Sequence, residues 1–131
     1  MIEFESEALS LKILVTAFDA FDGESTNPAL EAVHRLDTHI GEHVITKLEI
    51  PTVFHESKDV IDKELSKGDY EVVLSIGQAG GRYDLTPERV GINIDDARIP
   101  DNKGNQPIDV AIQEDGAPAY FSNLPIKTMT E

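Results

Sequence analysis

Residues 75–107 read SIGQAGGRYDLTPERVGINIDDARIPDNKGNQP. They begin inside a short apolar run, Val72–Ile76, whose β-branched composition is typical of a buried strand. Glycines, prolines, glutamines and charged residues follow this run directly, a composition typical of turns. In open sheets that combine strands and helices, ligands bind beyond the carboxyl ends of the strands, so this segment is a candidate functional loop.

The sequence before this segment alternates between strand and helix patterns. Leu11–Phe18 is mostly apolar and β-branched, and Val44–Ile50 alternates in the manner of a second strand. Between them, a helix is predicted to begin at Asn27 and Pro28 and to run to about Asp37. Asparagine can cap the first free N–H groups of a helix, and proline suits its first position.

A second helix is predicted over Glu56–Lys67, with Gly68 as its C-terminal stop. Val60, Ile61 and Leu65 would face inward at helical spacing. The resulting β-α-β-α-β order implies parallel strands joined by right-handed crossovers, with helices covering the sheet. We therefore predict an α/β fold in the form of a three-layer α/β/α sandwich.

The pattern changes after residue 88. Val90, Ile92 and Ile94 alternate with polar residues, and residues 100–105 have the composition of a turn. This predicts a strand and hairpin that project from the main sheet. A short helix is expected over residues 125–129.

Length and charge limit the classes of function. The chain has 131 residues, which predicts a single α/β domain over residues 11–131 after an N-terminal extension over residues 1–10. A net charge of -14, from 25 acidic and 11 basic residues, argues against binding to nucleic acid or to anionic membranes. No apolar run approaches the roughly 18 residues of a membrane span, and the acidic N-terminus does not resemble a signal peptide. We expect a soluble cytoplasmic protein.

The chain contains no cysteine, which excludes disulfides, thiolate metal sites and a cysteine nucleophile within this polypeptide. Its four histidines do not share a metal-ligand spacing; they are His34, His39, His43 and His55. The acidic residues of segment 95–109 do not have the spacing of a calcium loop, so a turn-rich acidic hairpin is the better interpretation. No metal or other cofactor is expected.

Two loops would lie at the carboxyl edge of the predicted sheet, over residues 18–28 and 77–82. Phe18 and Phe21 in the first loop could clasp a small apolar ring. Gln78 in the second loop offers a donor and an acceptor, and a lactam presents one of each. The alternative is that both phenylalanines belong to the core and that the glycines only shape turns.

Several motifs together resemble those of the pyroglutamyl peptidase I family, the pyrrolidone carboxyl peptidases of cysteine peptidase family C15. They are Ala17–Glu24 followed by Asn27 and Pro28, then Gly77–Gly81, Thr86–Val90, Asp96–Pro100 and Gly104–Pro107. The resemblance covers most of residues 11–130. It implies the phosphorylase/hydrolase-like form of the three-layer sandwich, with the C-terminal part of the family fold missing from this chain.

The resemblance also implies roles for particular residues. Family members use a cysteine, a histidine and a glutamate, and the Thr-Pro-Glu-Arg-Val motif places that glutamate at Glu88, where it would orient the histidine. Arg98 corresponds to an active-site arginine. The implied substrate-binding residues are Phe18, Phe21, Asn27 and Gln78. The chain departs from the family loop at Ala17, Ala20 and Asp22, and a left-handed backbone at Asp22 would suit glycine better.

The function implied by the resemblance is that of a cysteine omega-peptidase, which removes N-terminal pyroglutamate from peptides. All four histidines precede Glu88, so none fits the family's order of glutamate, cysteine and histidine. This chain is therefore expected to be inactive alone. The alternative is a non-catalytic binding or structural relative, or a truncated gene product. The expected partners are N-terminal pyroglutamyl peptides and further copies of the chain.

Overall fold

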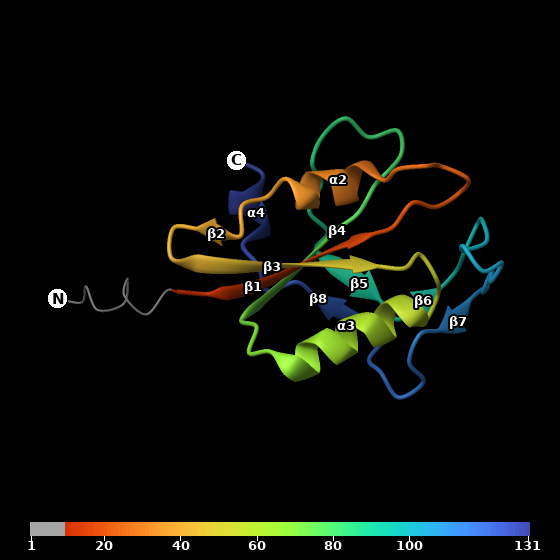
Figure 1. Cartoon of the computed structure of the whole chain (residues 1–131). Helices are drawn as coiled ribbons and strands as arrows, with labels where there is room; N and C mark the ends of the chain where they lie inside the picture. The colour runs from red at the N-terminus through yellow and green to blue at the C-terminus, as the bar shows by residue number, and fades with distance from the viewer. Residues whose placement is uncertain (1–9) are drawn as a thin grey trace. The chain divides into compact units, whose positions relative to one another are not determined.

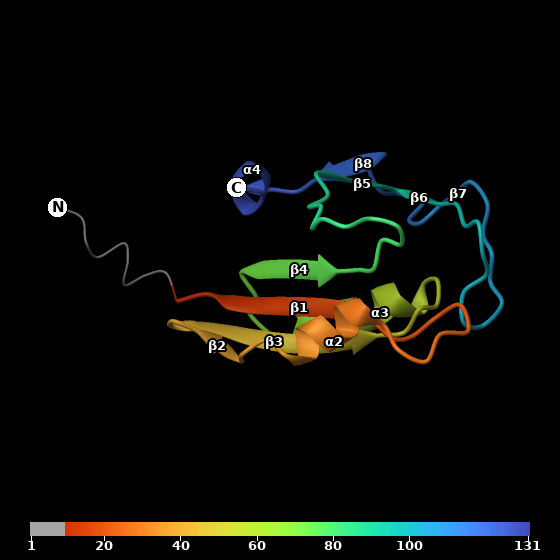
Figure 2. The same cartoon turned by 90° about the horizontal axis from the view of Figure 1, so that it is seen from above.

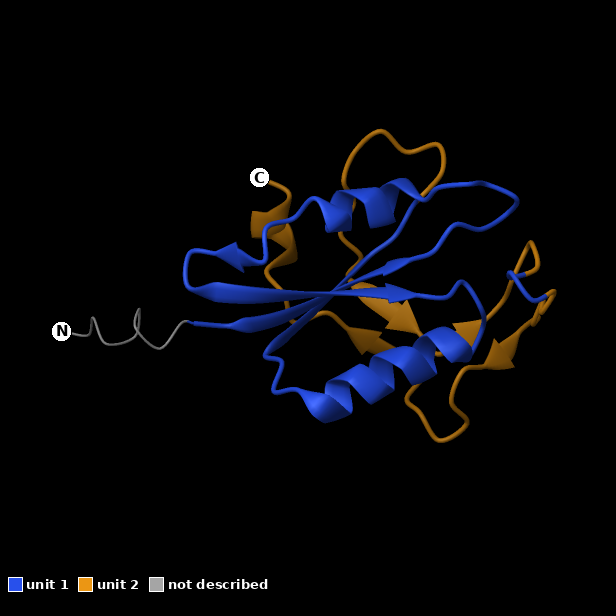
Figure 3. Ribbon diagram, viewed as in Figure 1, with its two compact units in different colours: residues 1–78, 101–103 blue, residues 79–100, 104–131 orange. Residues whose placement is uncertain are grey.

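The computed structural model describes residues 10–131, so the predicted extension lies almost wholly outside the described residues. These residues divide into two compact units (Figure 3). The first unit runs to Gln78 and also includes Asp101–Lys103. The second unit comprises Ala79–Pro100 and Gly104–Glu131.

The sheet of the first unit contains the three predicted parallel strands. They are β1 (Lys12–Phe18), β3 (His43–Ile50) and β4 (Val72–Ile76). β1 lies in the middle, with β3 on one side and β4 on the other, and both neighbours run parallel to it. A two-residue strand, β2 (His39–Ile40), adds an antiparallel edge beside β3 and was not predicted. The prediction of one parallel sheet is confirmed.

The two helices of this unit lie on opposite faces of the sheet (Figure 1). They are α2 (Pro28–His34) and α3 (Glu56–Lys67). The chain steps from β1 outward to β3 and then returns past β1 to β4. Crossovers between parallel strands are right-handed, so two crossovers that run in opposite directions along the sheet place their helices on opposite faces. Seen from above, the strands spread side by side as one layer (Figure 2). The predicted three-layer α/β arrangement is therefore present.

The core of the first unit lies between α2 and the sheet. Val15 and Ala17 of β1, Ile45 of β3 and Val33 of α2 form one buried apolar cluster. Leu14 is fully buried as well and points to the other face of the sheet, because successive side chains of a strand alternate. Each valine, leucine or isoleucine buried in this way contributes about 1.5–3 kcal/mol to folding.

The end of α2 differs from the prediction. The helix ends at His34, before the expected end at Asp37. The Arg35 N–H bonds back to the carbonyl of Ala32 (3.1 Å), which tightens the last turn. The Lys47 ammonium donates to the carbonyl of His34 (3.0 Å) and places a cation at the C-terminal end of the helix. These contacts replace the extra turn that the periodicity indicated.

α3 has the bounds that the sequence predicted. Val60 and Ile61 are half-buried, and Leu65 is 37% exposed, so the face that was predicted to point inward is only partly covered. Gly68 ends the helix with an extended backbone (φ -127°, ψ 161°), so it is not the left-handed cap that glycine often provides. A Cβ at this position would lie 2.7 Å from Cε2 of Tyr70, so space explains the glycine.

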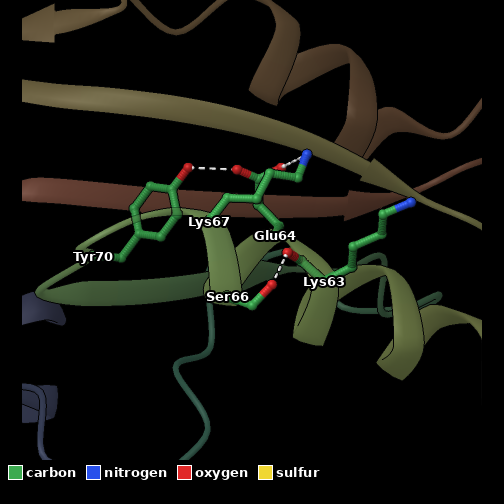
Figure 4. A network of polar contacts seen from close by, with 5 residues as sticks. All are labelled: Lys63, Glu64, Ser66, Lys67 and Tyr70. Atoms are coloured by element: carbon green, nitrogen blue, oxygen red, sulfur yellow. Dashed lines mark hydrogen bonds and ion pairs between the residues drawn. The ribbon is translucent and has the colours of Figure 1, made fainter.

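Polar contacts link Tyr70 to the last turn of α3 (Figure 4). The Tyr70 hydroxyl donates to the Glu64 carboxylate (2.7 Å), and the Lys67 ammonium lies 3.5 Å from the same carboxylate. In the same turn, the Ser66 hydroxyl donates to the Lys63 carbonyl (2.7 Å). The aromatic ring is therefore held against the helix end from which Gly68 departs.

The second unit consists of short antiparallel pairs and a short helix. β5 (Val90–Ile92) pairs with β8 (Ala119–Phe121), and β6 (Ile94–Asp95) pairs with β7 (Val110–Ala111). α4 spans Ile126–Met129, so the predicted helix is present and begins one residue later than expected.

The strand predicted after residue 88 is interrupted at Asn93. Its amide donates to the Gln113 carbonyl (2.7 Å) and accepts from the Gln113 N–H (2.9 Å). The Asn93 side chain thus makes hydrogen bonds that a backbone partner would make in a continuous strand pair. Two short strands are present where one longer strand was predicted. None of the helices formed by residues 10–131 has the length and apolar character that crossing a membrane requires.

Candidate functional site

The loop between β1 and α2 contains a tight turn at the first predicted site residues. The Glu24 N–H donates to the Phe21 carbonyl (3.1 Å). The two residues between them are left-handed, with φ of 55° at Asp22 and 75° at Gly23. The left-handed backbone anticipated at Asp22 is therefore present, and a short polar side chain tolerates it better than most others. The turn sets where Phe21 lies, and the side chain of Phe21 is half-buried.

Asn27 is only 2% exposed, and both ends of its side chain are engaged. Its Oδ1 accepts from the Ala29 N–H (2.9 Å), which confirms the predicted cap of α2. Its Nδ2 donates to the Asp19 carbonyl (3.2 Å) at the other end of the loop. One buried amide therefore ties the beginning of the loop to its end.

Asp19 joins several segments at this edge of the sheet and was not singled out by the sequence analysis. Its Oδ1 accepts from the Thr52 N–H (2.8 Å), from the Thr52 hydroxyl (2.8 Å) and from Nδ2 of Asn102 (3.3 Å). Asp19 follows β1 and Thr52 follows β3, and the carboxyl ends of neighbouring parallel strands meet at one edge. The order of the strands would therefore have predicted that Asp19 and Thr52 lie close together. It gives no signal for Asn102, which lies far along the chain.

Phe18 and Gln78 lie at the same edge of the sheet. Phe18 is the last residue of β1, and Gln78 lies just beyond β4. Because Ala17 is paired with Ile76, the register brings the two segments next to each other. Phe18 is half-buried, whereas Gln78 is exposed. Four predicted substrate-binding residues thus belong to the carboxyl edge of one sheet and its loops: Phe18, Phe21, Asn27 and Gln78.

The two predicted catalytic residues belong to the second unit. The Glu88 side chain is 77% exposed, and its Oε1 lies 3.6 Å from Nη1 of Arg82. The same Arg82 atom donates to the Thr86 hydroxyl (3.0 Å). Arg98 is exposed. An exposed ion pair of this kind contributes little to stability, about 0–1 kcal/mol, so it does not by itself explain a carboxylate at this position.

Acidic residues of segment 95–109 serve the turns of that segment. The Asp101 carboxylate accepts from the Phe54 N–H (2.8 Å) and from the Lys103 N–H (2.8 Å). The Asp96 carboxylate accepts from the N–H of Asp109 (3.2 Å), whose φ is 52°. Among the described residues, no three acidic or histidine side chains form a group that could hold a metal ion.

Comparison with known proteins identifies the family. The sequence model described as pyroglutamyl peptidase matches residues 11–131. This chain belongs to the pyroglutamyl peptidase family. The resemblance inferred from the motifs is thereby confirmed.

The relatives of this pyroglutamyl peptidase family member extend well beyond its length. The pyrrolidone-carboxylate peptidase of Staphylococcus haemolyticus is 86% identical over 121 residues, which are 92% of this chain and 57% of the relative. The corresponding protein of Staphylococcus carnosus is 68% identical over the same shares. The chain therefore spans little more than half the length of the curated relatives it matches.

Solved structures of the family confirm the fold class. Pyroglutamyl peptidase I from Bacillus amyloliquefaciens is 46% identical, with a TM-score of 0.86 over 91% of this chain and 57% of that structure. A mutant pyrrolidone carboxyl peptidase from Pyrococcus furiosus is 38% identical, with a TM-score of 0.87 over 91% and 58%. The α/β fold predicted for this chain is thus the fold of the family.

Proposed function

We propose that this chain provides the pyroglutamyl-binding part of a cysteine peptidase that removes N-terminal pyroglutamate from peptides. The observation that carries this proposal is the 86% identity to a pyrrolidone-carboxylate peptidase over nearly the whole chain. The grouping of Phe18, Phe21 and Gln78 at the carboxyl edge of the sheet supports it, because small ligands bind at that edge in open α/β sheets.

Each proposed substrate-binding residue has a chemical role. Phe18 and Phe21 would contact the apolar carbons of the five-membered ring. The exposed amide of Gln78 would donate to the lactam carbonyl and accept from the lactam N–H. Asn27 would hold the loop in its binding form and border the ligand.

Hydrolysis needs a nucleophile that this chain lacks. In an enzyme of this class, a histidine would take the proton of a cysteine, and the thiolate would attack the pyroglutamyl carbonyl. The peptide C–N bond would then break, the histidine would protonate the departing amine of the shortened peptide, and an acyl-enzyme would remain. Water would then release pyroglutamate. Glu88 would orient and charge-stabilise the histidine, and Arg98 would contribute a positive charge at the active site. The chain has no cysteine, so we propose that the polypeptide of 131 residues does not turn over substrate by itself.

A second candidate function is a non-catalytic, pyroglutamyl-binding or structural relative. The exposure of Glu88 and its pairing with Arg82 favour this alternative, since a triad carboxylate normally pairs with histidine. Both candidates share the ring site and differ in catalysis. We further propose a cytoplasmic location and self-association, the latter because β4 is an edge strand of the sheet within the described residues.

Two measurements test the proposed function. Calorimetry with the dipeptide L-pyroglutamyl-alanine should detect binding that Phe21→Ala weakens at least tenfold, while Phe121→Ala, a change in the other unit, leaves it intact. Equal affinity in both variants would place the ligand elsewhere. A fluorogenic pyroglutamyl-amide assay should show no turnover above background. Turnover that resists thiol alkylation and is lost on mutating a residue of this chain would overturn the proposed inactivity.

A further inference from the structure

We propose that Asn102 is a positioning residue for the β1–α2 loop and thereby for ligand binding. This inference rests on the proposed function, because it assigns that loop the task of holding the pyroglutamyl ring. It goes beyond the proposed function by naming a residue distant in sequence that sets the form of the site.

The contacts of Asn102 reach the loop directly. Its Nδ2 donates to the Ala20 carbonyl (2.8 Å) and lies 3.3 Å from Oδ1 of Asp19. Its backbone N–H donates to the carbonyl of Thr52 (3.0 Å). Ala20 immediately precedes Phe21, so the Asn102 amide holds the residue from which the Phe21 turn departs.

The same contacts extend to Asn27. The Asp19 carboxylate accepts from the Asn102 amide, and the Asp19 carbonyl accepts from the Asn27 amide (3.2 Å). The Thr52 hydroxyl lies 2.8 Å from Oδ1 of Asp19 and 3.2 Å from its backbone carbonyl oxygen. Asp19 therefore joins two amide side chains, one at the tip of segment 101–103 and one at the start of α2. A displaced Asp19 would move Phe21 and Asn27 together.

The tip that carries Asn102 is anchored independently of the loop. On one side of Asn102, the Asp101 carboxylate accepts from the Phe54 N–H (2.8 Å). On the other side, the Lys103 ammonium pairs with the Glu56 carboxylate in the first turn of α3 (2.5 Å). These contacts lie on the β3–α3 side of the sheet edge and do not involve loop 18–27. The Asp101 carboxylate and the Asn102 N–H hold the backbone of the tip, whereas the exposed Lys103–Glu56 pair adds little. The Asn102 side chain reaches from the tip to the loop.

The chemistry of the contact makes a specific prediction. Both partners of Nδ2 are oxygens, one a carbonyl and one a carboxylate, so the site needs a donor. Asn102→Asp keeps the size of the side chain but removes the donor and adds a negative charge beside Asp19. Asn102→Ala removes the donor without adding charge. If Asn102 positions the loop through hydrogen bonding, the aspartate variant should bind the ligand more weakly than the alanine variant. If Asn102 acts through packing alone, the aspartate variant should bind it more tightly.

The experiment compares the wild type with Asn102→Ala, Asn102→Asp and Lys103→Ala, which removes the neighbouring ion pair on the same tip. Side-chain amide and aromatic NMR resonances of Asn27 and Phe21 report the form of the loop without ligand. Titration with L-pyroglutamyl-alanine reports affinity. We expect Asn102→Ala to shift both sets of resonances and to weaken binding about tenfold, equivalent to 1.4 kcal/mol. Asn102→Asp should weaken it further, and Lys103→Ala should resemble the wild type.

The outcomes separate this inference from the proposed function. If the wild type binds no ligand, the proposed function fails, and the Asn27 and Phe21 resonances of the free variants still decide whether Asn102 positions the loop. Unchanged resonances in both Asn102 variants would overturn the inference. An aspartate variant that binds better than the alanine variant would also overturn it. Loss of the dispersed NMR signals of β1 and β3 in both variants would also overturn the inference, because it would show that Asn102 is needed for the sheet to fold.

Discussion

The hydroxyl of Tyr70 donates a hydrogen bond of 2.7 Å to the carboxylate of Glu64 across the end of α3. This bond is the largest cause of a lowered pKa of Glu64 and of a raised pKa of Tyr70. Desolvation, which by itself raises the pKa of a carboxyl group, does not reverse the direction at Glu64. The pair therefore links the stability of the helix end to pH at both ends of the scale.

We predict that Tyr70→Phe lowers the urea midpoint at pH 7 and that this difference disappears in acid and in strong base. A lowered pKa of Glu64 stabilises the fold above the ordinary pKa of a glutamate, about 4.3, and this stability is lost as the pH falls through the folded value. A raised pKa of Tyr70 stabilises the fold below about pH 10, and this stability is lost as the pH rises through the folded value. Tyr83→Phe is the matched control, because Tyr83 is fully exposed. A constant difference between pH 3 and pH 7 would contradict the prediction.

Gly68→Ala should destabilise the first unit by about 1–2 kcal/mol, because overpacking forces neighbouring groups to shift. The added Cβ would meet Cε2 of Tyr70 at 2.7 Å, and the ring would have to leave its place against α3. Chemical denaturation measures the loss. Gly77→Ala serves as the control, since a Cβ there meets nothing within 4 Å. Equal midpoints for the two variants would show that the ring moves aside without cost.

Asn27→Ala should cost about 2–3 kcal/mol of stability. It removes a helix cap, worth about 1 kcal/mol, and it leaves the Asp19 carbonyl without one buried donor, which costs about 1–3 kcal/mol. Asn123→Ala changes an exposed residue of the same type and should be nearly neutral. The measurement is the free energy of unfolding from urea titrations. A loss below about 0.5 kcal/mol, the low end of cap values, would show that water replaces both contacts.

The edge position of β4 predicts self-association. β4 is paired only with β1 among the described strands, and Val73 on it is 41% exposed. An unpaired, apolar strand edge favours contact with another chain, and lysine on such an edge opposes it. Analytical ultracentrifugation should therefore show a dimer or larger species that Val73→Lys shifts toward monomer. Leu65, which is exposed on a helix and not on a strand edge, provides the control as Leu65→Lys. A wild type that stays monomeric at high concentration would refute this prediction.

The elements that the sequence predicted well are those fixed by local signals. The helix predicted at about Glu56–Lys67 is present, because apolar spacing and Gly68 both mark its limits. The cap at Asn27 and the left-handed backbone at Asp22 were also foreseen, since each depends on the chemistry of its own residue. Parallel pairing followed from the alternation of strands and helices.

The features that escaped prediction depend on partners distant in sequence. The His34 carbonyl at the end of α2 accepts from Lys47, which belongs to β3. The strand after residue 88 is divided because Asn93 binds the backbone of Gln113. The contact between Asp19 and Asn102 has no counterpart in local periodicity or composition. Pattern analysis locates the elements, but it does not identify which side chains will meet.

The inclusion of Asp101–Lys103 in the first unit has a consequence for how the chain folds during synthesis. A ribosome delivers β1, β3 and β4 long before it delivers Asn102, so the sheet can assemble while the β1–α2 loop still lacks a partner. The last contact of that loop closes a span of 83 residues, and closures of high contact order are slow. We therefore expect the edge that we propose to bind the ligand to complete its contacts after the sheet of this unit has formed.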